Sequence, residues 1–237
     1  MVDIDWLDRS IVLFLNQFAG KSPVFDRLIY DIADSSLLQG GLFMAYLWWL
    51  WFRTDRDAIA RRHDVLVMFL GALVAVLLSR LMQVALPFHS RPLHAPGLDF
   101  VVPAGVNPAT LSRWSSFPSD HAMLFCALSV AIWCRSRLLG TMAMVWSLVV
   151  ICLPRIYLGY HYPSDVIGGA VFGIVTMLAI RRLFRRYGWL DRVVEWEATH
   201  KTVFYCLAFL ATYELAVLFY DVRRLGLDGY HIARTIM

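Results

Sequence analysis

Six runs of apolar residues occupy most of this sequence, and each approaches the length that a helix needs to cross a membrane. They cover roughly residues 35–52, 65–86, 119–134, 138–155, 165–180 and 202–220. A spanning helix needs about 20 apolar residues, with a range of roughly 17–25. Backbone groups in lipid must hydrogen-bond within their own segment. We therefore predict an all-α integral membrane protein, a bundle of six transmembrane helices.

The composition agrees with a chain that lies in a bilayer. Hydrophobic residues make up 59% of the chain and charged residues 17%, against about 45–50% and 25% in soluble domains. The mean hydropathy is +0.58. The third and fifth runs are short and begin with polar residues, so we expect their N-terminal ends to lie in a protein-lined or wet cavity.

An amphipathic segment, residues 4–18, precedes the first run. Its apolar residues recur at helical spacing, and Gly20 to Pro23 end the pattern. Because it is too polar to span, we predict a helix that lies in the membrane interface. The acidic start of the chain lacks the basic region of a cleavable signal peptide, so the first span should act as the insertion signal. The predicted division is a lead-in (1–34), a core (35–222) with a long loop (88–117), and a tail (223–237).

Arginines set the expected orientation, because short cytoplasmic loops carry an excess of basic residues. The basic residues that gather on one side are Arg53, Arg56, Arg61, Arg62, Arg135, Arg137, Arg181, Arg182, Arg185, Arg186, Arg192 and Lys201. This side should be cytoplasmic, which leaves the 88–117 loop and the 157–163 turn outside. The tail arginines, Arg223, Arg224 and Arg234, then also lie outside and depart from the rule.

Two further classes are not expected. The net charge of +4 comes from arginines in short loops rather than from a basic patch, so we predict no nucleic-acid partner. The four cysteines fall inside apolar runs without a CxxC pair, which predicts buried free thiols rather than disulfides or metal ligands. They are Cys126, Cys134, Cys152 and Cys206.

Three polar clusters share the outer side. They are Arg91-Pro92, residues 118–121 (Pro-Ser-Asp-His) and residues 155–165 (Arg-Ile-Tyr-Leu-Gly-Tyr-His-Tyr-Pro-Ser-Asp). Pro-Ser-Asp occurs twice, at 118–120 and 163–165, and each copy carries the start signals of a helix. Helix N-termini attract phosphate, and arginine guanidiniums bind it bidentately. The clusters therefore predict a phosphate site that contains His121 and His161 beside Arg91 and Arg155.

The same residues offer a complete phosphoryl-transfer chemistry. A neutral imidazole can attack phosphorus, and a second, protonated imidazole can give the leaving oxygen a proton. A carboxylate can fix the tautomer of the attacking ring. Asp165 follows His161 by four residues across a helix start, and Asp120 is the other candidate for this role.

Three other interpretations compete. A zinc site would draw on His89, His94, His121, His161, Asp99, Asp120 and Asp165. No HxxxH or HExxH spacing is present and the nearby arginines would repel a dication, so we expect no metal. A non-catalytic lipid carrier should hold charges through the depth of the bundle, but Glu214 is the one clear acid in the sixth run. A scaffold protein would not need the histidine–arginine cluster.

The three clusters resemble the signature of the type 2 phosphatidic acid phosphatase family, Lys-x6-Arg-Pro, Pro-Ser-Gly-His and Ser-Arg-x5-His-x3-Asp. The match covers roughly residues 80–169. The resemblance implies a six-helix core and a phosphohistidine mechanism without a metal or other cofactor. It implies that His161 is the nucleophile, Asp165 its orienting carboxylate and His121 the general acid. The implied phosphate-binding residues are Arg91, Arg155 and Ser119.

Three departures refine the resemblance. Val84 stands where the family has Lys, and Arg80, one helical turn earlier, could supply a replacement charge, whereas Gln83 could supply only hydrogen bonds. Pro154 replaces the usual Ser. Asp120 replaces the usual Gly, and the resulting Pro-Ser-Asp-His resembles the bacitracin-resistance type of undecaprenyl pyrophosphate phosphatase; we count Asp120 among the phosphate-site residues.

The resemblance therefore implies an enzyme that hydrolyses a lipid phosphate or pyrophosphate at the outer face of a bacterial inner membrane. Undecaprenyl pyrophosphate is the first expected substrate. The alternative is a phosphotransferase that passes the same phosphate to a sugar or lipid hydroxyl instead of water.

Overall fold

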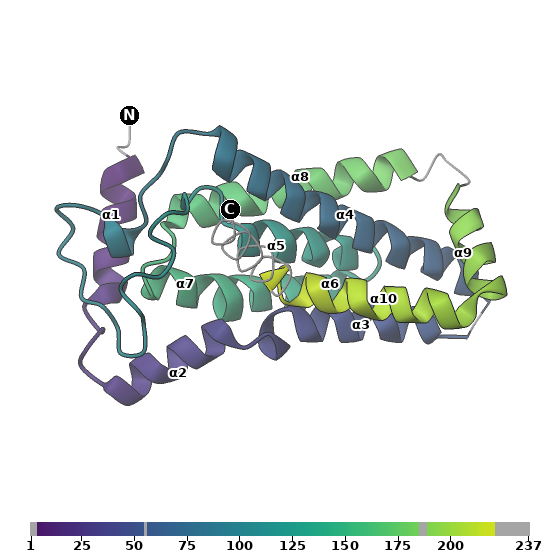
Figure 1. The fold of residues 1–237 in the computed structure, drawn as a ribbon, viewed down its shortest axis with the longest axis horizontal. Helices are drawn as coiled ribbons and strands as arrows, with labels where there is room; N and C mark the ends of the chain where they lie inside the picture. Colours follow the sequence, from purple (N-terminus) through teal and green to yellow (C-terminus); the bar gives the residue numbers. More distant parts are fainter. Residues whose placement is uncertain (1–3, 55, 185–188, 221–237) are drawn as a thin grey trace, which may run out of the picture.

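A computed structural model describes residues 4–54, 56–184 and 189–220, and this part of the chain is helical without a strand (Figure 1). The elements are α1 (Ile4–Asn16), α2 (Pro23–Asp34), η1 (Leu37–Gly41), α3 (Leu42–Phe52), α4 (Ala58–Ala85), η2 (Pro92–His94), α5 (Asp120–Trp133), α6 (Arg137–Trp146), η3 (Ser147–Cys152), α7 (Leu153–Tyr157), α8 (Pro163–Phe184), α9 (Trp189–Thr199) and α10 (Lys201–Ala216). The all-α prediction is confirmed for these residues. The predicted tail 223–237 lies outside them, as do Arg185 and Arg186.

Three helices of the described chain are long and apolar enough to cross a membrane. They are α4, the continuous stretch Arg137–Tyr157, and α8. Leu37–Phe52 and α5 are apolar but shorter, and α10 has 16 residues. Six spans therefore stays a prediction. The expectation of a short fifth run is wrong, because α8 begins at Pro163 and continues through Arg181 and Arg182 over 22 residues.

Helix α5 is the centre of the bundle. It packs against α4, α6 and α8, and most of its side chains are buried. Gly173 lets α8 lie directly on the α5 backbone, because a Cβ there would stand 2.1 Å from the carbonyl oxygen of Met123. A Cβ on Gly169 would stand 2.5 Å from the carbonyl oxygen of Ser119. Two glycines four apart in α8 thus let it pack closely against the first turn of α5.

The first helix, α1, runs across one end of the bundle beside the 88–117 loop (Figure 1). Two of its polar side chains, Asp8 and Asn16, face the protein and are 5% and 3% exposed, while Asp5 and Arg9 are exposed. Its aromatic side chains face outward, with Trp6 and Phe14 at 64% and 63% exposed. The Asn16 amide donates to the Val101 carbonyl at 2.7 Å and accepts from the Val101 amide at 2.8 Å. Buried polar groups on α1 therefore fasten the loop.

Helix α2 falls in the predicted lead-in, where no helix was expected. Ser22 caps it by accepting a hydrogen bond from the Phe25 amide. Its buried Asp26 accepts from the Gly20 and Ala104 amides at 3.0 and 2.9 Å, and from the Tyr157 hydroxyl. This one carboxylate joins the N-terminal segment, the loop and α7.

The two ends of the bundle differ in character. The 88–117 loop, the 157–163 turn and α1 lie at one end, and α9 with the start of α4 lies at the other (Figure 1). Helix α9 was not expected from the sequence. It is held by Arg62 to Glu197 at 2.9 Å and by His63 to Asp191 at 3.0 Å. The three polar clusters therefore gather at the end away from α9.

Candidate active site

The two helix starts expected from the repeated Pro-Ser-Asp meet at the site. The Ser119 hydroxyl caps α5 by accepting from the Ala122 amide at 3.4 Å. The Ser119 amide donates to the Asp165 carbonyl at 3.1 Å, which joins the start of α5 to the first turn of α8. A residue distant in the sequence caps α8. The Asp8 carboxylate of α1 accepts hydrogen bonds from the Ser164 amide at 2.9 Å and from the Ser164 hydroxyl.

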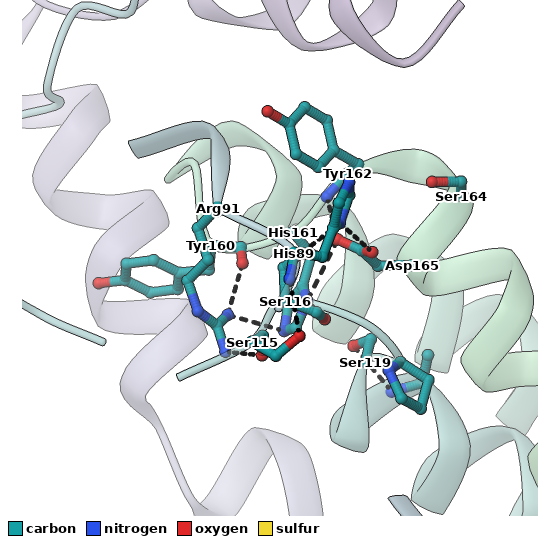
Figure 2. Close-up of polar contacts among 12 residues, drawn as sticks. His89, Arg91, Ser115, Ser116, Ser119, Tyr160, His161, Tyr162, Ser164 and Asp165 are labelled. Atoms are coloured by element: carbon teal, nitrogen blue, oxygen red, sulfur yellow. Dashed lines mark hydrogen bonds and ion pairs between the residues drawn. The ribbon is translucent and has the colours of Figure 1, made fainter. Parts of the chain in front are cut away.

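His161 lies between these helix starts and is 2% exposed. Its Nδ1 is 2.9 Å from the Ser116 carbonyl oxygen. A carbonyl can only accept, so Nδ1 carries the proton and Nε2 presents a lone pair. Nε2 is 3.4 Å from Nη1 of Arg91 (Figure 2). Burial lowers the His161 pKa. The ring is therefore neutral at neutral pH, with its reactive nitrogen beside a guanidinium.

Asp165 lies on the protonated side of the His161 ring. Its Oδ2 accepts from the Tyr162 amide at 2.7 Å and is 3.7 Å from His161 Nδ1. Asp165 is thus close enough to stabilise positive charge on the ring, but the direct hydrogen bond that fixes the tautomer goes to the Ser116 carbonyl. Sequence reasoning missed Ser116, because a backbone acceptor has no side-chain signature.

Arg91 is 3% exposed and its guanidinium is held by backbone carbonyls (Figure 2). Nε donates to Trp114 at 3.1 Å, Nη1 to Tyr160 at 2.5 Å and Nη2 to Ser115 at 3.0 Å. Burial lowers its pKa to about 10, so it stays charged at neutral pH. Three of its five N–H groups are used in this way. A fourth, on Nη1, faces the Nε2 lone pair of His161 at 3.4 Å, and the fifth, on Nη2, is left to take a phosphate oxygen next to His161.

His121 belongs to a separate chain of polar contacts. Its Nδ1 is 2.8 Å from Oδ1 of Asp120, and Oδ2 of Asp120 is 2.5 Å from Nη2 of Arg80. Arg80 also donates to Gln83 at 2.9 Å, and Gln83 donates to the Pro118 carbonyl at 2.9 Å. The carboxylate leaves Nε2 of His121 as the end that can exchange a proton with a substrate.

This arrangement explains two departures from the family pattern. Val84, at the usual Lys position, is 79% exposed and faces away from the bundle. Arg80, which the sequence offered as a replacement charge for the phosphate, has its guanidinium on Asp120. Asp120 therefore contacts His121 and Arg80.

Arg155 reaches the site from α7 but contacts the N-terminal segment. Its Nη2 donates to the Ala33 carbonyl at 3.0 Å and to the Gln39 side chain at 3.2 Å. Its Nε is buried and has no hydrogen-bond partner among the described residues. A donor left open in this way is the group that an anionic ligand would satisfy.

The histidines weighed as metal ligands separate in the structure. His89 lies at the site, with Nδ1 2.7 Å from the Ser116 hydroxyl and 3.3 Å from Oδ1 of Asp165. His94 instead contacts the Thr110 carbonyl at 2.8 Å. Within residues 4–54, 56–184 and 189–220, no three His, Cys, Asp or Glu side chains form a group that could hold a metal ion.

Comparison with known proteins adds to this geometry. The model of the PAP2 superfamily matches residues 65–189. The chain is 30% identical over 183 residues to YbjG of Escherichia coli, named as a candidate undecaprenyl-diphosphatase, covering 77% of this chain and 85% of that one. It is 28% identical over 173 residues to the undecaprenyl-diphosphatase BcrC of Bacillus subtilis, covering 71% and 80%.

Two further similarities concern a lipid A protein and a solved structure. The lipid A 1-diphosphate synthase of Escherichia coli is 30% identical over 190 residues, covering 73% of this chain and 75% of that one. The crystal structure of a PAP2-type phosphatidylglycerolphosphate phosphatase from Bacillus subtilis superposes with a TM-score of 0.50 at 18% identity. That similarity covers 78% of this chain and 88% of the other and shows a common fold.

Proposed function

Because the chain belongs to the PAP2 superfamily, is a phosphatase and has membrane-spanning helices, we propose that it removes phosphate from a lipid diphosphate through His161. The observation that carries this proposal is the tautomer of His161. Its Nδ1 proton is held by the Ser116 carbonyl, and its Nε2 lone pair points toward Arg91. Undecaprenyl diphosphate is the substrate we favour, since two relatives that cover most of the chain are named for it.

The first step forms a bond between His161 Nε2 and the terminal phosphorus. The bond from that phosphorus to the bridging oxygen breaks, and protonated His121 gives its Nε2 proton to this leaving oxygen. Asp165 stabilises the positive charge that develops on the phosphorylated ring. In the second step neutral His121 takes a proton from water, the water oxygen attacks phosphorus, and inorganic phosphate leaves with Nε2 of His161 restored.

The phosphate oxygens need donors that are already in place. The open N–H on Nη2 of Arg91 and the unpartnered Nε of Arg155 are such donors. Ser119 and the start of α5 add the N-terminal end of a helix dipole. Asp120 and Arg80 act indirectly in this proposal: Asp120 contacts His121, and Arg80 contacts Asp120, so neither binds the phosphate.

The proposal extends to how the chain lies in the membrane. We propose that the stretch 37–52, α5 and α10 cross with the three longer helices. At about 1.5 Å per residue, the 14 residues of α5 span only about 21 Å. Its start is enclosed by protein at the site, so it does not need to reach the outer headgroups. The arginine-bearing end would be cytoplasmic and the site would face the periplasm. Helix α1 would lie in the outer interface with its aromatic face in lipid.

The decisive experiment measures inorganic phosphate released by the purified protein in detergent with EDTA. The substrates are undecaprenyl diphosphate and phosphatidic acid, and the variants are wild type, His161→Ala and His94→Ala. We expect wild type and His94→Ala to release phosphate and His161→Ala to release none. His94 is the matched control because it lies in the same region but contacts Thr110.

Each possible result has a distinct meaning. Release by His161→Ala would refute the nucleophile assignment. Loss of activity in EDTA, restored by a divalent metal, would refute the metal-independent mechanism. Transfer of labelled phosphate to an added lipid or sugar hydroxyl, without inorganic phosphate, would identify a phosphotransferase instead.

A further inference from the structure

His89 is a second imidazole that lies beside the Asp165 carboxylate, the same carboxylate that lies beside His161. Its Nδ1 is 3.3 Å from Oδ1 of Asp165, while Oδ2 of the same carboxylate is 3.7 Å from Nδ1 of His161. The two rings therefore approach opposite oxygens of one buried carboxylate, whose side chain is fully enclosed. Figure 2 shows both rings gathered at Asp165.

The connection is built through Ser116 as well. The Ser116 hydroxyl is 2.7 Å from Nδ1 of His89, and the Ser116 carbonyl accepts a hydrogen bond from Nδ1 of His161. The Ser116 amide also donates to the His89 carbonyl at 2.9 Å. Ser116 thus contacts both rings, and the shared serine and the shared carboxylate connect His89 to the proposed nucleophile.

Unlike His161, His89 has access to solvent. Its side chain is 44% exposed and lines an open cavity of about 200 Å³ between α1 and the start of the 88–117 loop. The charged and titratable groups that face His89 are Asp165 of α8, Asp5, Asp8 and Arg9 of α1, and Tyr162 of the 157–163 turn. The Asp165 carboxylate beside Nδ1 raises the His89 pKa. Its positive charge is therefore present below neutral pH and is lost as the pH rises through this raised value.

We propose that His89 is a positioning residue for the phosphatase reaction, whose protonation sets how strongly Asp165 acts on His161. When His89 is protonated, it forms an ion pair with Asp165, which weakens the interaction of Asp165 with His161. The positive charge of His89 also repels positive charge on the His161 ring. Both effects disfavour a proton on Nε2 of His161, so the nucleophile stays available in acid. When His89 is neutral, Asp165 is released to stabilise the positive phosphorylated ring. This inference rests on the proposed function of His161.

The test compares His89→Asn, His89→Ala and His94→Asn with wild type and His161→Ala. Asparagine places an N–H donor near the position of Nδ1 but carries no charge, whereas alanine removes both. Phosphate release from undecaprenyl diphosphate in detergent gives kcat and KM at about pH 7.5 and about pH 5.5, pH values that bracket an ordinary histidine. The ratio of kcat/KM at the lower pH to that at the higher pH reports protonation of the free enzyme.

We expect this ratio to fall by about threefold or more in His89→Asn, because uncompensated Asp165 then favours protonated His161. His94→Asn should keep the wild-type ratio. At the higher pH, His89→Asn should retain more of the wild-type kcat than His89→Ala, with KM little changed in both.

A wild-type ratio in His89→Asn, or equal kcat losses in the asparagine and alanine variants, would overturn the role of His89. Activity in His161→Ala would overturn the proposed function instead.

Discussion

Replacing Asp120 with Asn tests whether the carboxylate beside His121 takes part in catalysis. The carboxylate accepts three hydrogen bonds, from Nη2 of Arg80 at 2.5 Å, from Nδ1 of His121 at 2.8 Å and from the His121 amide at 2.9 Å. An amide has one oxygen and one NH2 group, so it cannot accept from both sides. If its oxygen faces His121, its NH2 group meets the guanidinium of Arg80. If its oxygen faces Arg80, its NH2 group forces the wrong tautomer on His121.

The size of the loss follows from these contacts. A hydrogen bond to a charged group contributes about 1.5–3 kcal/mol. Lost in the transition state, one such bond lowers kcat by roughly 10- to 150-fold. Because the remaining donors to the phosphate are untouched, KM should change little. We therefore expect a fall of about a hundredfold in kcat for Asp120→Asn.

The assay is steady-state phosphate release, with Asp64→Asn as the matched control. Asp64, on α4, is likewise a carboxylate paired with an arginine, 3.0 Å from Nη1 of Arg135, but it lies at the opposite end of the bundle from Asp120, which begins α5. Its variant should keep kcat within about twofold of wild type, since surface-proximal ion pairs contribute little. A kcat for Asp120→Asn as high as that of Asp64→Asn would refute the reasoning.

Three further predictions concern the cap of α8, the hydrogen bonds of Arg91 and the turn at Gly159. Asp8→Ala should lower Tm by about 2–6 °C, since a lost helix cap costs about 0.5–2 kcal/mol, whereas the exposed Asp5→Ala should not; equal melting curves in detergent would contradict this. Arg91→Lys should lower kcat/KM by about a hundredfold, because an ammonium cannot donate to the three carbonyls and to phosphate as the planar guanidinium does, and wild-type kinetics would exclude this role. Gly159→Ala should lower Tm by about 2–6 °C, because φ is 74° and a Cβ would stand 2.5 Å from Phe100, and an unchanged Tm would show that the turn adapts.

Much of the bundle could be predicted because apolar runs and helix-start signals are local. Residues 118–120 and 163–165 carry Pro, Ser and Asp at the head of an apolar run, and α5 and α8 begin there. The length of α8 was underestimated because arginines were read as the end of the run, although Arg181 and Arg182 continue the helix. Helix α2 was not predicted although its apolar residues recur at helical spacing, because its 12 residues are too short and too polar to form an apolar run of spanning length.

The site could be predicted only in part. The sequence placed His161, His121 and Arg91 on one side of the membrane, and the structure brings them to the same helix starts. It could not reveal that Ser116 fixes the His161 tautomer or that backbone carbonyls hold Arg91, since any residue type can supply a carbonyl. Nor could it reveal the cap from Asp8, whose partner Ser164 is 156 positions away.

That last contact has a consequence for how the protein is made. Ribosomes add roughly 5–20 residues per second, so α1 is synthesised on the order of 8–30 s before its partner at the start of α8. Throughout that interval the inward-facing Asp8 has no helix end to cap, and the aromatic face of α1 can keep the segment at the membrane surface. The contact between α1 and the active-site end can therefore form only after the start of α8 has been synthesised. A bulky fusion before residue 4 should slow the formation of this contact and delay the onset of activity after synthesis, while leaving the insertion of the later helices unchanged.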